Sequence, residues 1–373
     1  MERLNERISR RALLRDGAVG ISALAATALV GCGTSDDKKA APTGAASPTP
    51  LAATQPAATP TRAASKPVWA RLPSGPGPAA RRDHSLTFNA DDGLIYLFGG
   101  RAKGVADNQL WTFDPKAGSW RQVVADDRPE PRFAHDASYD AANKRLIVTL
   151  GQGNGGAFFN DVWAYADGRW TQLDGSSAEH PEIRYGAGGA HDKAGHRILI
   201  SHGFTDRGRF DDTWAFDLSA GIWSKIATTG AAPIKRCLTR CLWQAGSLLM
   251  FGGQTDDNPF LGDFWALDVA RGAWSERSAA PLPGPRNLYG ASLDGGGKRW
   301  YIVGGNTAQG PTDEVWAHET AAGAWSRIDA AGEAPPRRYS TDAAYADGKL
   351  YIFGGHDGTS EIDDMWALAT DAA

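Results

Sequence analysis

Six arginines recur along the chain at nearly constant spacing and are its most regularly placed charges. They are Arg81, Arg132, Arg184, Arg236, Arg286 and Arg337. A guanidinium presents a planar fork of donors that matches a carboxylate, so two roles are open. The arginines could form a positive surface that selects a carboxylate or an acidic loop. They could instead pair with recurrent acids downstream, namely Asp161, Asp212, Asp263, Glu314 and Asp364. We favour the structural pairing, because one asymmetric ligand would not need six identical contacts.

Positions that break the repeat are better candidates for ligand contacts. One such set follows a recurrent pair that usually holds two glycines: Arg101, Gly153, Phe204, Gln254, Asn306 and His356. A second set stands three residues after the arginines: His84, His135, Ala187, Thr239, Tyr289 and Ser340. Polar groups mixed with aromatic rings suit sugar or peptide recognition. The ligand-binding candidates are therefore Arg101, Phe204, Gln254, Tyr289, Asn306 and His356, together with the six arginines. For His84 and His135 we expect structural hydrogen bonds.

Sequence motifs for catalysis or metal binding are either absent from the chain or lack the structural context that they require. Residues 151–156 match Gly-x-Gly-x-x-Gly, but a strand rather than a helix follows, so the dinucleotide interpretation falls. The sequence has neither a Gly-x-Ser-x-Gly elbow nor a His-Glu-x-x-His motif. His191, His196 and His202 could bind zinc, yet strand geometry sends His202 to another end. We predict no catalytic residue, no metal and no cofactor, and the question of an enzyme stays open.

The two cysteines near the middle of the chain are not expected to form a disulfide. If Cys237 and Cys241 lie on one strand, they stand about 13 Å apart, beyond disulfide reach. We interpret both as small buried apolar residues.

The elements that must position these residues form an internal repeat, marked by two tryptophan series. The first series advances in steps of 52, 51, 51, 51 and 50 residues: Trp111, Trp163, Trp214, Trp265, Trp316 and Trp366. The second is Trp120, Trp170, Trp223, Trp274 and Trp325, and one step back from Trp120 reaches Trp69. Each unit also contains an Arg-led segment and an apolar run, and most of these runs end in a glycine pair. Four strands in a unit of about 50 residues are typical of a propeller blade.

The motifs of these units resemble those of kelch-repeat β-propellers. The resemblance rests on Pro-x-x-Arg-x-x-His, Gly-Gly, Asn-Asp-x-Trp and a final Trp, and it covers residues 67–373. It departs at Gly151-Gln152 and His202-Gly203, where the glycine pair is incomplete. The resemblance implies an all-β, six-bladed propeller, with the strand around Trp69 completing the last blade. Variable loops would then surround one mouth of the central channel and carry function.

The first residues indicate export rather than structure. Ser9 to Arg15 followed by the uncharged stretch 17–31 resembles a twin-arginine signal, and Leu29 to Cys32 resembles a lipoprotein box. We expect residues 1–31 to be removed and Cys32 to be lipidated, with ordinary cleavage near residues 23–28 as the alternative. Residues 32–66, rich in Ala, Pro and Thr, are predicted to form a disordered tether.

Charge and composition narrow the functional class without naming a ligand. A net charge of −4 disfavours a nucleic-acid binder. We expect a monomeric, exported lipoprotein that faces the periplasm or the cell exterior and binds a protein or a glycan at the channel mouth. The alternative is a carbohydrate-active enzyme of mutarotase or epimerase type that uses the same mouth.

Overall fold

The computed structural model describes residues 66–73, 75–174, 177–277 and 281–370. The predicted signal segment and Cys32 lie outside the described residues, as does all of the tether except Lys66. Within the described part, no helix is long and apolar enough to cross a membrane.

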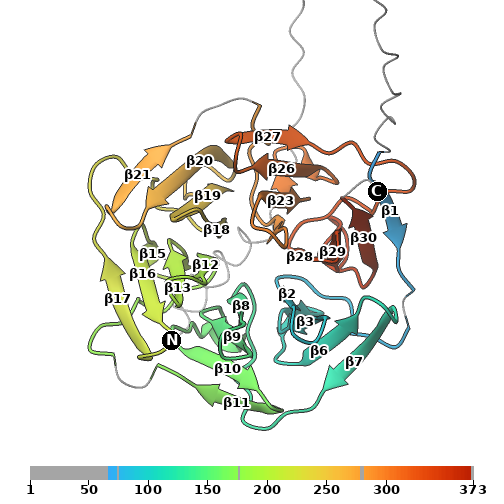
Figure 1. The fold of residues 1–373 in the computed structure, drawn as a ribbon, viewed down its shortest axis with the longest axis horizontal. Helices are drawn as coiled ribbons and strands as arrows, with labels where there is room; N and C mark the ends of the chain where they lie inside the picture. The colour runs from blue at the N-terminus through green and yellow to red at the C-terminus, as the bar shows by residue number, and fades with distance from the viewer. Residues whose placement is uncertain (1–65, 74, 175–176, 278–280, 371–373) are drawn as a thin grey trace, which may run out of the picture. The chain divides into compact units, whose positions relative to one another are not determined.

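The described strands form six four-stranded antiparallel sheets arranged as blades around an axis (Figure 1). Each blade runs from an innermost to an outermost strand. Blade 1 contains β2 (Ser85–Asn89), β3 (Leu94–Phe98), β6 (Leu110–Asp114) and β7 (Ser119–Val123). Blade 2 contains β8 (Asp136–Asp140), β9 (Arg145–Thr149), β10 (Val162–Ala166) and β11 (Arg169–Gln172). Blade 3 contains β12 (Gly188–Asp192), β13 (Arg197–Ser201), β16 (Thr213–Asp217) and β17 (Ile222–Ile226).

The second half of the ring repeats this order. Blade 4 contains β18 (Arg240–Gln244), β19 (Ser247–Gly253), β20 (Leu261–Asp268) and β21 (Ala273–Glu276). Blade 5 contains β22 (Gly290–Leu293), β23 (Arg299–Val303), β26 (Val315–Glu319) and β27 (Ala324–Arg327). Blade 6 contains β28 (Asp342–Ala346), β29 (Lys349–Phe353), β30 (Met365–Ala369) and, outermost, β1 (Val68–Arg71), which pairs with β30. The all-β, six-bladed prediction is confirmed.

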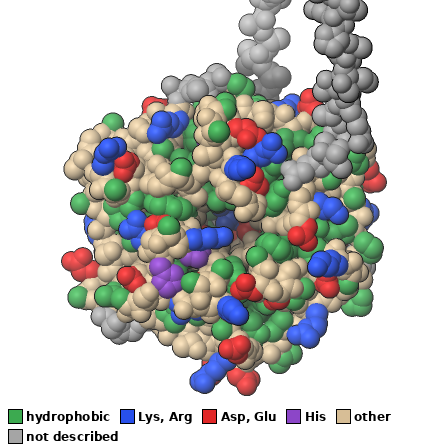
Figure 2. All heavy atoms as spheres, viewed as in Figure 1, with side chains coloured by type: hydrophobic (Ala, Val, Ile, Leu, Met, Phe, Trp, Pro, Cys, Tyr) green, Lys and Arg blue, Asp and Glu red, His purple; other side chains and the backbone are tan. Residues whose placement is uncertain are grey.

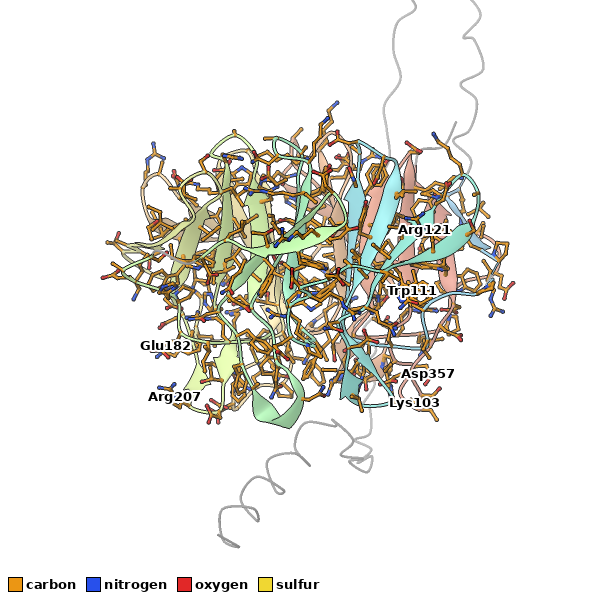
Figure 3. The ribbon with its side chains drawn as sticks, turned by 90° about the horizontal axis from the view of Figure 1, so that it is seen from below. Lys103, Trp111, Arg121, Glu182, Arg207 and Asp357 are labelled. Atoms are coloured by element: carbon orange, nitrogen blue, oxygen red, sulfur yellow. The ribbon has the colours of Figure 1, made fainter. Side chains whose placement is uncertain are left out.

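Short hairpins and turns that follow the second strand of a blade lie at one end of the ring. They are the hairpins β4 (Arg101–Ala102) with β5 (Val105–Ala106), β14 (Phe204–Thr205) with β15 (Gly208–Arg209) and β24 (Asn306–Thr307) with β25 (Gly310–Pro311), and a 3-10 turn at Asn154–Gly156. In Figure 3, the labelled residues Lys103, Glu182, Arg207 and Asp357 all lie at this end. We call it the loop face, and the opposite end the turn face.

Apolar side chains fill the six gaps between neighbouring blades, one cluster in each gap. The outer tryptophans pack on a phenylalanine of the preceding blade. The ring centroids of Trp170 and Phe98 are 5.0 Å apart, and those of Trp120 and Phe353 are 5.1 Å apart. Burying one such ring contributes about 4–6 kcal/mol of transfer free energy. The tryptophan repeat therefore marks the positions that hold the blades together.

Near the axis, backbone hydrogen bonds connect the blades in a closed belt. Six residues take part, each with φ between 47° and 61°: Asp83, Ala134, Gly186, Leu238, Leu288 and Ser340. Each donates its N–H to the carbonyl of its equivalent in the preceding blade, and Asp83 closes the circle on Ser340 at 2.8 Å. Left-handed backbone costs about 1–2 kcal/mol in non-glycine residues. The belt offsets that strain, because it pairs every N–H and carbonyl involved.

Candidate functional site

The buried arginines lie just outside this belt and hold each loop to its own blade. Arg132 donates to Asp161 through both terminal nitrogens, at 2.6 and 2.9 Å, and to the Leu150 carbonyl at 3.0 Å. Arg184, Arg236 and Arg338 pair in the same way with Asp212, Asp263 and Asp364. Arg286 donates to Glu314 through one terminal nitrogen only. Burial opposes ionisation of Asp263, yet the hydrogen bond from Arg236 holds the pKa of that carboxyl below its ordinary value. The predicted pairing with acids is thus observed.

Blade 1 is a variation on this arrangement. Arg81 donates to Gln109 at 3.3 Å and lies 3.5 Å from Asp107. All six ring arginines have side chains that are 0–1% exposed. They therefore offer no charge to a ligand at the surface.

Arg337, predicted as the sixth member, is not in the ring; Arg338 takes its place. Arg337 is 71% exposed and lies 3.8 Å from Asp313, whereas Arg338 is buried and donates to Gly354. The ring arginine and the carbonyl it reaches flank one antiparallel hairpin and are always 16 or 18 residues apart. An odd separation, as from Arg337 to Gly354, would put the side chain on the wrong side of the strand.

Three other predicted positions also differ in the structure: Gly153 and Ser340 are each one residue out of register, and Tyr289 is buried. In blade 2 the glycine pair corresponds to Leu150 and Gly151, so Gln152 rather than Gly153 occupies the variable position opposite Phe133. In blade 6 the equivalent of Tyr289 is Thr341 rather than Ser340. Tyr289 itself is 1% exposed and donates its hydroxyl to the Phe251 carbonyl at 2.7 Å, so it does not reach the loop-face surface.

His84 and His135 are also buried between blades. His84 packs edge-on against Phe353 at 5.6 Å, and His135 against Phe98 at 5.3 Å. Burial lowers the pKa of His84 to about 3 and moves that of His135 in the same direction. Both rings are therefore neutral at physiological pH. His135 Nε2 lies 3.0 Å from Ser85 Oγ, in agreement with a structural hydrogen bond.

The remaining five candidates do surround the mouth on the loop face, and all are partly exposed. Arg101, Phe204, Gln254, Asn306 and His356 each bridge to the residue that follows a ring arginine. These partners are Arg82, Tyr185, Cys237, Asn287 and Tyr339. The structure therefore pairs the variable residues after the glycine pairs with a second variable set, the residues that follow the ring arginines. The sequence analysis did not use this second set, although the residue after the arginine differs among the blades and could have identified it.

Aromatic side chains concentrate on blades 2 and 3 of this mouth. Tyr185 lies 5.6 Å from Phe204, 5.8 Å from Phe158 and 6.1 Å from Phe133. Arg101 lies over Phe133 at 4.3 Å, and Arg209 over Phe204 at 5.2 Å. We call these four rings the aromatic ledge. Aromatic residues and arginine are the types enriched at protein interfaces.

Charged and polar groups occupy the rest of the rim. Arg101 pairs with Asp83 at 2.7 Å, and Arg82 with Glu361 at 3.5 Å. Asn287 donates to Gln254 at 2.9 Å. Across the ring from the ledge, His356 lies 5.1 Å from Tyr339, and its Nδ1 accepts from Gly358. The mouth is thus asymmetric, although the scaffold beneath it is nearly sixfold.

Three groups that could suggest metal or nucleophilic chemistry have other roles. His191 and His202 make separate contacts, to Tyr139 and Ser201, and no cluster of metal-ligating residues exists among the described residues. Cys237 and Cys241 are buried and free, and burial raises the pKa of Cys237 to about 11.

Ser219, His196 and Asp140 form a third such group on the turn face. Ser219 Oγ lies 2.7 Å from His196 Nδ1, and Asp140 lies 3.5 Å from Nε2. The amide nitrogen of Asn143 donates to Asp140 and faces Nε2 at 2.9 Å, so Nε2 is the acceptor and Nδ1 carries the proton. His196 therefore donates to Ser219 and cannot act as its base.

Comparison with known proteins agrees with this architecture. The family model described as the KLHDC2/KLHL20/DRC7 Kelch-repeats domain matches residues 63–253 and 237–373. Host cell factor 2 of Homo sapiens is 26% identical over 68% of this chain and 35% of its own length. The Caenorhabditis elegans host cell factor homolog hcf-1 is 24% identical over 80% of this chain and 44% of its own length. The Arabidopsis thaliana serine/threonine-protein phosphatase BSL2 is 30% identical over 43% of this chain and 16% of its own length.

This chain thus spans less than half the length of each of these three relatives. Six blades, the tryptophan series and the family match over most of the chain lead to one assignment. The chain belongs to the kelch-repeat family described as the KLHDC2/KLHL20/DRC7 Kelch-repeats domain.

Proposed function

We propose that this propeller is a protein-binding module whose partner docks on the loop face, across the aromatic ledge and the mouth. The observation that carries the proposal is the asymmetry of the mouth. Phe133, Phe158, Tyr185 and Phe204 gather beside two arginines, while the equivalent positions of blades 4 and 5 hold a buried cysteine and amides. Kelch propellers typically act as protein-interaction modules, which favours the same function.

The axial space beneath the mouth is too small for a free sugar. The cavity between the belt and Arg240 is about 30 Å³ and is lined by Asp83, His135, Thr239 and Tyr289 among others. Small-molecule sites usually measure about 300–1,000 Å³. Recognition on this face therefore depends on the rim, where a partner can cover several blades at once.

The test places a photocrosslinking side chain at Phe204 in the full-length protein, expressed in its native cells. A matched probe at Tyr139, at the other end of the same scaffold on blade 2, serves as the control. We expect the probe at position 204, and not the probe at position 139, to crosslink to a partner protein, which is then identified from the crosslinked product. Unlabelled protein should compete, whereas the Tyr185→Ala variant should compete at least tenfold less well. Equal crosslinking from both positions, or full competition by Tyr185→Ala, would refute the proposal.

The alternative of a carbohydrate-active enzyme makes a different prediction for the same mouth. Acidic and neutral sugars incubated with the protein should then show accelerated anomeric exchange by NMR. Loss of that turnover on Arg101→Ala or His356→Ala would replace the binding function with catalysis at the rim.

We further propose that the propeller is exported and tethered to a membrane by a lipid on Cys32. The support is the sequence from Arg10 to Cys32, which has a twin-arginine pair, an apolar stretch and a lipoprotein box. Cys32→Ser should move the protein from the membrane to the soluble fraction. Unchanged membrane retention would contradict the anchor but would leave loop-face binding untouched.

A further inference from the structure

The first residue of each innermost strand forms a column around the central channel. Its members are Ser85, Asp136, Gly188, Arg240, Gly290 and Asp342. We call this set the axial column. Charged residues stand on blades 2, 4 and 6, and small residues stand on blades 1, 3 and 5. The repeat itself does not need these charges, because glycine serves at two equivalent positions. Charges placed near the axis lose solvation, so their presence points to a role beyond folding.

Asp342, one of the three charged residues, forms an ion pair with Arg240, another of them. Asp342 Oδ2 accepts from the Leu86 amide of blade 1 at 3.0 Å, and Oδ1 lies 3.3 Å from Arg240 Nη2. The side chain of Asp342 is 9% exposed. Asp342 therefore acts as an anchor that fixes the position of the guanidinium.

The other two keep hydrogen-bonding capacity that the described residues do not use. Arg240 is 26% exposed, and its guanidinium makes the ion pair with Asp342 but donates no hydrogen bond within the described part of the chain. Asp136 is partly exposed, and no described residue donates to its carboxylate or pairs with it within 4.0 Å. The two nevertheless interact electrostatically. Burial lowers the pKa of Arg240, but the negative charges of Asp342 and Asp136 raise it by more, so that the pKa lies above its ordinary value.

The neighbouring blade leaves room for the Asp136 carboxylate. A Cβ added to Gly189 would lie 1.9 Å from Asp136 Cγ, so glycine at this position of β12 is what allows the side chain to lie there. Close by along the same strands, Thr87 Oγ1 and Ser138 Oγ are buried without a hydrogen-bond partner among the described residues, as is His135 Nδ1.

Access to the axial column is from the turn face. The belt of backbone hydrogen bonds surrounds the channel at its loop-side end, and the cavity of about 30 Å³ lies beside the belt and Arg240. Figure 2 views the face opposite the loops labelled in Figure 3 and shows a hollow at the centre of the ring. The axial column thus belongs to a different surface from the aromatic ledge.

We propose that Arg240 and Asp136 form a binding site in the central channel for a carboxamide group. The guanidinium donates to the carbonyl oxygen, and the carboxylate accepts from the amide N–H. A carboxylate of the same shape would be repelled by Asp136, and an amidinium by Arg240. Asp342 fixes the position of the guanidinium.

The test uses three small planar probes of the same shape and different charge: acetamide, acetate and acetamidinium. Each is titrated at pH 8 into the full-length protein, and the 15Nε resonance of Arg240, assigned with Arg240→Lys, reports binding. We expect a saturable shift with acetamide and at least tenfold weaker binding of the other two. Asp136→Asn removes the charge that repels acetate and adds an amide donor, while Oδ1 can still accept, so the preference should shift toward acetate. Melting curves confirm that the variant is folded, and Asp257→Asn on an exposed loop is the matched control.

Each failure has a distinct meaning. Equal responses to all three probes, no saturable response, or an unchanged ranking in Asp136→Asn would overturn the site and assign the axial charges to structure alone. Tyr185→Ala should bind acetamide as the unmodified protein does, because the aromatic ledge lies on the other face. Failure of loop-face binding and failure of the axial site are therefore independent results.

Discussion

At the residue scale, neighbouring side chains of the same type can have opposite roles. Arg337 and Arg338 are adjacent, yet one is 71% exposed and the other 1% exposed with two hydrogen bonds to Asp364. Removing one partner of a buried ion pair leaves an uncompensated charge, which costs about 3–5 kcal/mol. Position within the hairpin, rather than residue type, decides which arginine is structural.

We therefore predict that Arg338→Met lowers the free energy of unfolding by about 3–5 kcal/mol. Arg337→Met, its matched control, should stay within about 0.5 kcal/mol, as is usual for surface substitutions. Chemical denaturation of both variants measures the difference. Similar stability of the two would show that the buried pair is not needed.

Asp136 gives a pH-dependent prediction. Burial raises its pKa to about 7, Arg240 opposes that rise and Asp342 adds to it, and Cys241 is the other titratable group close to it. Because the native pKa exceeds the unfolded value, the native state binds more protons between about pH 4 and pH 7. The contribution of Asp136 to stability is thus full below pH 4 and is lost as the pH rises through 7.

Asp136→Asn removes this dependence, so its melting temperature should exceed that of the unmodified protein by about 2–5 °C at pH 8. The difference should disappear near pH 4. Melting curves across this range, with Asp257→Asn as control, measure it. A variant that is less stable at pH 8, or a difference independent of pH, would contradict the assigned pKa.

At the scale of strands and loops, the glycine pairs determine how closely neighbouring blades approach. A Cβ on Gly304, where φ is +64°, would lie 2.5 Å from the Arg338 carbonyl of the next blade. Gly297 has nearly the same φ, +65°, but nothing within 4 Å of the added atom. These two positions separate backbone strain from contact between blades.

We predict that Gly297→Ala costs about 1 kcal/mol, the usual penalty of left-handed backbone. Gly304→Ala should cost at least 2 kcal/mol more, a rough estimate for overpacking against a backbone atom that cannot turn aside. Urea denaturation compares the two. Equal losses would mean that the blades separate easily at this contact.

The sequence predicted elements better than it predicted the site. Trp and Gly recur with a fixed period because every blade needs the same ring between sheets and the same turn at the axis, so period alone located the strands. Assignments that depended on a single residue of register failed, as at Gly153 and Arg337. Tyr289 broke the repeat without facing a ligand, because its hydroxyl satisfies a carbonyl of the preceding blade. The axial column could not be predicted, because Ser, Gly, Asp and Arg share no type and come together only through topology.

At the scale of the whole molecule, the ring is joined both near the axis and at its rim. The belt of backbone hydrogen bonds runs through all six blades, and at the rim β1 adds the outermost strand to blade 6. Trp69 on β1 is 5% exposed and packs in the cluster between blades 5 and 6. Without β1, β30 would become an exposed edge. Both proposed surfaces depend on a rigid ring, so closure is the central claim.

The most direct test is the thermal unfolding of the full-length protein carrying Trp69→Ala. Truncation of a buried tryptophan costs about 3–5 kcal/mol, which should lower the melting temperature by about 5–10 °C. Hydrogen exchange should also become faster in β30. A melting temperature within about 1 °C of that of the unmodified protein, with unchanged exchange in β30, would show that the ring does not depend on β1.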